Sequence, residues 1–107
     1  MRDDEGGQAR RTRALVNPFV VEIADALLEL GGEAHRDRVL GLAAARRGQA
    51  AVGPDLSRDL IEAFDLHMAQ AERQGAPPLF ALPSGRDGEG WSLTEPARRL
   101  LSARVRA

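Results

Sequence analysis

The chain has 107 residues, of which 29% are charged and 43% hydrophobic, and its formal net charge is −1. This composition is typical of one globular domain. The absence of cysteine excludes disulfides, thiolate nucleophiles and cysteine-type zinc sites. No stretch approaches the ~18 apolar residues of a membrane span, and no signal-peptide region follows the first methionine. We therefore expect a cytoplasmic protein, associated with the nucleoid if it binds DNA.

All fifteen basic residues are arginine, and they are unevenly distributed. Residues 10–13, 35–48 and 95–106 each carry an excess of three positive charges, whereas residues 18–34 and 55–73 are acidic. A codon bias toward arginine accounts for the absence of lysine. Alternatively, arginine is retained because its planar guanidinium contacts phosphate or guanine through two hydrogen bonds. The net charge of −1 argues against a protein whose whole surface attracts nucleic acid. It remains compatible with nucleic-acid binding by a local basic patch.

Residues 1–14 show no periodicity and include Gly6-Gly7, which predicts a flexible N-terminal arm ahead of one domain over residues 15–107. Such a basic arm is either simply solvated or enters a DNA minor groove.

Two helices are predicted in the first half of this domain. Asn17 is a favourable N-cap and Pro18 a favourable first helical residue. Apolar residues then recur at three- and four-residue steps until Gly31-Gly32, which ends the helix. After a short extended link at 33–35, a second helix is expected over about 36–47.

A third helix and a hairpin are predicted in the second half. The helix is expected over about 55–74, and Gly75-Ala76-Pro77-Pro78 ends it. Two short apolar segments, about 79–83 and 90–93, flank a loop rich in glycine and indicate a β-hairpin. Thr94 is placed to cap a final helix. The expected fold class is mainly α with a small β-hairpin (α+β), with a three-helix core, a two-stranded wing and a C-terminal helix.

Two segments resemble a known family. LGGEAHRDRVLGLAA (30–44) is similar to the first helix-turn-helix step of the N-terminal winged-helix modules of Mrr-like restriction endonucleases and of HARE-type winged helices. LFALPSGRDGEGWSLTE (79–95) resembles the wing of these modules and of many bacterial winged-helix regulators. Over about residues 17–101 the resemblance implies a winged helix-turn-helix fold, with duplex DNA as the usual ligand.

The leading hypothesis is therefore a small DNA-binding protein, a transcription regulator that acts by occupying DNA or by recruiting other proteins. Arginines of the second helix are candidates for positioning contacts, because helix N-termini present free N–H groups to phosphate and guanidinium adds charge-assisted bonds. The start of the third helix and the hairpin tip are candidates for base contacts. The predicted DNA-binding residues are Arg36, Arg38, Arg46, Arg47, Ser57, Arg58 and Arg86. The alternative for the second-helix arginines is pairing with local acids such as Asp37.

The outward positions of the third helix favour another class of function. Glu62, Asp65 and Glu72 fall there, and carboxylates that face phosphates weaken DNA binding. The alternative is thus a winged-helix protein-interaction adaptor that has lost duplex binding. A third hypothesis is the targeting subunit of a restriction-type system. In each case the C-terminal helix, with Leu100 and Leu101 on its apolar ridge, either closes the core of its own chain or pairs two copies as a homodimer.

No arrangement typical of an enzyme is present. His35 and His67 are the only imidazoles and lack the HxxxH or HExxH spacing of zinc sites. We interpret His35 as a turn or capping residue and His67 as partly buried with one nitrogen satisfied. Trp91 shares a strand face with Leu93, which predicts a core position rather than a platform for stacking bases. We expect no catalytic residue, metal or cofactor.

Overall fold

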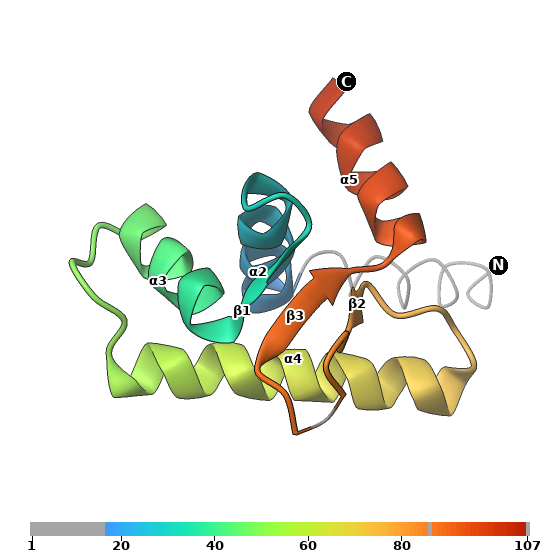
Figure 1. Cartoon of the computed structure of the whole chain (residues 1–107), viewed down its shortest axis with the longest axis horizontal. Coiled ribbons are helices and arrows are strands. Elements are labelled where there is room, and N and C mark those ends of the chain that lie inside the picture. The colour runs from blue at the N-terminus through green and yellow to red at the C-terminus, as the bar shows by residue number, and fades with distance from the viewer. Residues whose placement is uncertain (1–16, 86, 107) are drawn as a thin grey trace, which may run out of the picture.

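The computed structural model describes residues 17–85 and 87–106. The predicted arm at 1–14 and the candidate Arg86 lie outside the described residues. Figure 1 shows a long helix along one side of the molecule, two shorter helices and a small sheet packed on it, and a last helix on the opposite side. The elements run in the order helix, strand, helix, helix, strand, strand, helix.

The described part of the chain contains four helices and a three-stranded antiparallel sheet. The helices are α2 (Pro18–Glu29), α3 (Arg36–Arg46), α4 (Pro54–Gln74) and α5 (Glu95–Arg106). The strands are β1 (Glu33–His35), β2 (Phe80–Ala81) and β3 (Gly90–Leu93), and their order in the sheet is β1-β3-β2. The predicted α+β class with a majority of helix is confirmed, and each predicted helix is present within two residues of its expected bounds.

Helix α2 begins and ends as its sequence predicts. The Asn17 side chain accepts hydrogen bonds from the N–H groups of Phe19 (3.0 Å) and Val20 (3.3 Å), two of the donors that the first turn leaves unpaired. At the other end of α2, Gly31 and Gly32 have backbone φ values of 96° and 94°, which residues with a Cβ atom rarely adopt.

The extended link at 33–35 forms a third strand, so the sheet is larger than the predicted two-stranded hairpin. β1 pairs with β3 in the register Glu33↔Ser92, Ala34↔Trp91 and His35↔Gly90. Three residues are too few for their polar-apolar pattern to distinguish a strand from an extended link. The segment becomes a strand only because it pairs with β3, nearly 60 positions along the chain.

The hairpin strand β2 is shorter than predicted. Its ladder covers only Phe80↔Leu93 and Ala81↔Ser92. Pro83 has no N–H to give to the ladder, and the chain turns at once, with the Gly85 N–H donating to the Leu82 carbonyl at 3.0 Å.

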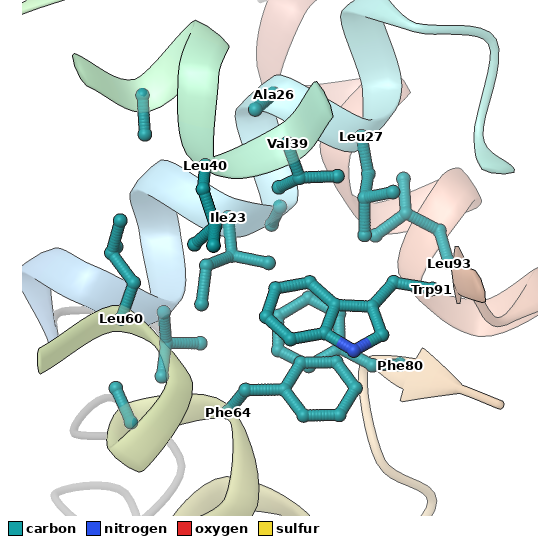
Figure 2. Close-up of a cluster of buried hydrophobic side chains, with 14 of the residues drawn as sticks. Ile23, Ala26, Leu27, Val39, Leu40, Leu60, Phe64, Phe80, Trp91 and Leu93 are labelled. Atoms are coloured by element: carbon teal, nitrogen blue, oxygen red, sulfur yellow. The ribbon is translucent and has the colours of Figure 1, made fainter. Parts of the chain in front are cut away.

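The core is shared by the helices and the sheet, as Figure 2 shows. Three aromatic rings stack at its centre: the Phe64 centroid lies 4.0 Å from that of Trp91 and 5.0 Å from that of Phe80. Trp91 is only 4% exposed, which confirms its predicted core position. Ala97 and Leu101 of α5 are buried in the same cluster, so α5 closes the core of its own chain.

The connection from α4 to β2 is fixed by two polar side chains. His67 is buried, and its Nε2 accepts a hydrogen bond from the Leu79 N–H at 3.0 Å. The Thr94 hydroxyl donates to the Pro78 carbonyl at 2.8 Å, and the Thr94 N–H donates to the Leu79 carbonyl at 2.9 Å. His67 is therefore a buried histidine with one nitrogen satisfied, as predicted.

Candidate functional site

The arginines at the end of α3 bind carboxylates of α2. Arg47 donates from Nε and Nη2 to the two carboxylate oxygens of Glu22 at 2.7 and 2.6 Å, and its guanidinium lies 5.4 Å from the centroid of the Phe19 ring. These hydrogen bonds raise the pKa of Arg47 above its ordinary value. Arg46 donates a single hydrogen bond from Nη2 to Oε2 of Glu29. Both arginines connect α3 to α2, and the acids that they pair with lie on this neighbouring helix, farther along the chain than the local acids that the sequence interpretation considered.

The arginines at the start of α3 are held less closely by carboxylates than those at its end. Arg36 lies in an exposed ion pair with Glu89, with Nη2 and Oε1 3.5 Å apart. Arg38 is exposed, and no hydrogen bond or ion pair in the described part of the chain involves it. Of the four second-helix candidates, Arg38 alone has a guanidinium without a described partner.

The first turn of α4 offers little free positive charge. Arg58 lies between two carboxylates of its own helix, with Nη2 3.4 Å from Asp55 and Nε 3.9 Å from Asp59. Ser57 is half-buried beside it. These two candidates are consecutive residues of α4, and two acids lie beside the donor.

The outer face of α4 carries a net negative charge. The helix carries five carboxylates and two arginines. Glu62 and Asp65 are exposed, and no ion pair among the described residues involves either of them. Leu66 directly follows Asp65 and lies one turn after Glu62, with 51% of its surface exposed. We call this surface the α4 face; its exposed members are Asp55, Arg58, Glu62, Asp65, Leu66, Ala69, Gln70, Glu72 and Arg73.

The electrostatics of the α4 face determine what it can bind. Unpaired carboxylates at the surface create a negative potential that repels phosphate and attracts cationic groups. An exposed leucine among them adds apolar area that a partner can cover. The α4 face therefore suits a positively charged ligand with an apolar side chain.

A cluster of polar groups joins β1, α3 and the hairpin. His35 Nδ1 accepts the Asp37 N–H at 3.0 Å and caps α3, as predicted, so the ring proton lies on Nε2, 2.7 Å from Glu89. The ligand atoms of His35, Asp37 and Glu89 lie within 4.8 Å of one another, a spacing that suits a metal ion. His35 and Glu89 are bound to each other, the Asp37 carboxylate lies 3.8 Å from His35 Nδ1, and the Arg36 guanidinium supplies the nearby positive charge. Sequence reasoning missed Glu89, since it is 54 positions from His35.

None of the helices in residues 17–85 and 87–106 is both long and apolar enough to cross a membrane. Comparison of the chain with protein-family models, curated proteins and solved structures gives no match. The interpretation of function therefore depends on the geometry and charge of the described residues.

Proposed function

We propose that this chain is a non-catalytic protein-binding module with a winged-helix arrangement, and that its α4 face holds a basic partner. The order of elements supports the arrangement. In α2-β1-α3-α4-β2-β3, α3 and α4 supply the helix-turn-helix, and β2 and β3 supply the wing. These are the parts that the resemblance to winged-helix modules implies.

The charge of the α4 face carries the proposal. In DNA-binding helix-turn-helix proteins the second helix of the pair enters the major groove. Here no ion pair among the described residues involves Glu62 or Asp65 of that helix, and the guanidinium of Arg58 is shared by two carboxylates. A groove lined with phosphates would meet net repulsion, whereas lysine or arginine side chains of a partner would meet attraction.

The experiment compares two fluorescent probes by anisotropy over a salt series. One is a cationic peptide that forms an amphipathic helix with a central leucine, and the other is a random-sequence DNA duplex. Replacing Glu62→Arg together with Asp65→Arg should weaken peptide binding by about tenfold, which corresponds to about 1.4 kcal/mol. The matched control is Glu33→Arg, an exposed carboxylate outside α4, which should change the affinity little. Peptide binding that is unchanged by the double reversal would remove the α4 face from the interaction.

Duplex DNA binding, as in a transcription regulator or a restriction-type targeting subunit, is the second candidate, and Arg38 favours it. This guanidinium is exposed in the first turn of α3, where helix-turn-helix proteins contact the DNA backbone. The neighbouring Arg36–Glu89 pair is exposed, and such pairs contribute only about 0–1 kcal/mol, so phosphate can displace them. A wild-type duplex affinity that falls steeply with salt, together with no binding of the cationic peptide, would support this candidate instead.

A further inference from the structure

Among the described residues, the large hydrophobic side chains that are exposed are Leu66 (51%) and Leu100 (44%). Leu66 lies on α4 and Leu100 on α5. Figure 1 shows α4 along the lower edge of the molecule and α5 extending from the upper edge, with α2 and the sheet between them. The two leucines of one chain therefore cannot cover each other.

The surroundings of the two leucines are complementary in charge. Leu66 is flanked on the α4 face by Glu62 and Asp65. Leu100 is flanked by the exposed Arg99, whose only described ion pair is a 3.7 Å contact with the exposed Glu95. Over their full lengths, α4 carries five carboxylates and two arginines, whereas α5 carries one carboxylate and four arginines.

The shapes of the two surfaces also match. Each leucine is followed three positions later by an exposed alanine, Ala69 on α4 and Ala103 on α5. Residues three apart are neighbours on a helix surface. An alanine beside each leucine leaves space for the leucine of a facing helix, which is the ridge-into-groove arrangement of packed helices.

We propose that α5 of one copy of this chain docks on the α4 face of a second copy. This inference depends on the proposed function, because it names a partner for the same protein-binding surface. In the contact, Leu66 of one copy and Leu100 of the next are covered together, and Arg99 lies against Glu62 and Asp65. The interaction joins two different surfaces. An assembly of any length therefore keeps one free α4 face at one end and one free α5 at the other, and head-to-tail chains form.

A contact between two helices is small, so the association is weak and depends on concentration. Because exposed charges contribute, it also weakens as ionic strength rises. This association differs from a symmetric dimer formed by α5 against α5, which would use only Leu100 and would bring like charges together.

The experiment measures weight-average mass by sedimentation equilibrium over a range of protein concentrations. One variant combines Glu62→Gln and Leu66→Gln on α4, and the other combines Arg99→Gln and Leu100→Gln on α5. All four side chains are exposed and glutamine favours helix, so both variants should fold, which Trp91 fluorescence checks. The control Arg38→Gln removes an arginine outside both helices.

The wild type and the control should show a mass that rises with concentration and falls with salt. Each variant alone should remain at the monomer mass of 11.6 kDa. An equimolar mixture of the two variants should form dimers, and no larger species, because one variant keeps an intact α5 and the other an intact α4 face.

Three results would overturn the inference: a wild type that is monomeric at every concentration, an α4 variant that still dimerises by itself, or a mixture that stays monomeric. If the wild type is monomeric while the cationic peptide still binds the α4 face, the inference fails and the proposed function stands. If neither self-association nor peptide binding is found, both fail.

Discussion

His67 is a buried residue whose neutral form the fold requires. Its Nε2 accepts a hydrogen bond from the Leu79 N–H, so this nitrogen must be unprotonated. Removal from water disfavours the charged imidazolium and lowers the pKa of His67 below its ordinary value. The ring also lies edge-on to Phe80, 5.3 Å between centroids. A single imidazole, about two turns before the end of α4, thus connects this helix to the start of the hairpin.

The lowered pKa predicts that mild acid destabilises the protein through His67. In the unfolded chain this histidine takes up a proton below about pH 6.5, whereas the folded state resists it. The free energy of unfolding should therefore fall as pH drops from about 7 to about 5.5, by at most about 1.4 kcal/mol per pH unit from this group. Urea unfolding at several pH values measures the slope.

The variants His67→Gln and His35→Gln separate the two histidines in this experiment. His67→Gln removes the titrating ring and should flatten the slope. His35→Gln changes the exposed capping histidine and should leave the His67-dependent loss in place. An equal slope in the wild type and in His67→Gln would contradict the assigned role.

At the scale of elements, α2 is central because the other helices and the sheet all pack on it. Its buried residues Ile23 and Leu27 are fully covered, and it contacts α3, α4, α5 and the sheet. Its first turn relies on one side chain, Asn17, for two otherwise unpaired N–H groups. Pro18 at the first helical position needs no such partner.

Replacing Asn17→Ala should lower the free energy of unfolding by about 1 kcal/mol, because two N–H groups of α2 lose their acceptor. Asn17→Asp keeps an oxygen acceptor at the same position and should retain most of the stability. Thermal or urea unfolding of the three proteins provides the comparison. A loss in Asn17→Asp as large as that in Asn17→Ala would show that the cap is not the cause.

At the scale of the whole molecule, one core joins every described element. Trp91 of β3 stacks on Phe64 of α4, and Ala97 and Leu101 of α5 are buried in the same cluster as Ile23 of α2. Opening any layer exposes the others, which favours cooperative unfolding.

We therefore predict that Trp91 fluorescence, which reports the aromatic stack, and far-ultraviolet circular dichroism, which reports the helices, follow the same urea transition. Trp91 is the only tryptophan, so the fluorescence signal has one source. Phe64→Ala should shift both transitions together, at a cost of about 3–5 kcal/mol. Two separated transitions would mean that the sheet and the helices unfold independently.

Local signals were sufficient for the helices. Asn17-Pro18, Gly31-Gly32 and Gly75 act within a few residues of themselves, and the apolar stripes of α2 and α4 repeat within one or two turns. The core position of Trp91 followed from the two-residue alternation of a strand, and that of His67 from the helical periodicity of α4. The winged-helix arrangement and its ligand remain proposals.

Only the tertiary structure decided which charges are free, and with them the candidate site. Arg47 and Glu22 are 25 positions apart, and Arg36 and Glu89 are 53 apart, so no local pattern shows that these arginines already have partners. The third strand has the same origin, since β1 exists only because β3 pairs with it. The sequence alone determined where helices begin, end and turn their apolar sides, because those preferences act between near neighbours. Strand pairing and ion pairing act between segments that only folding brings together.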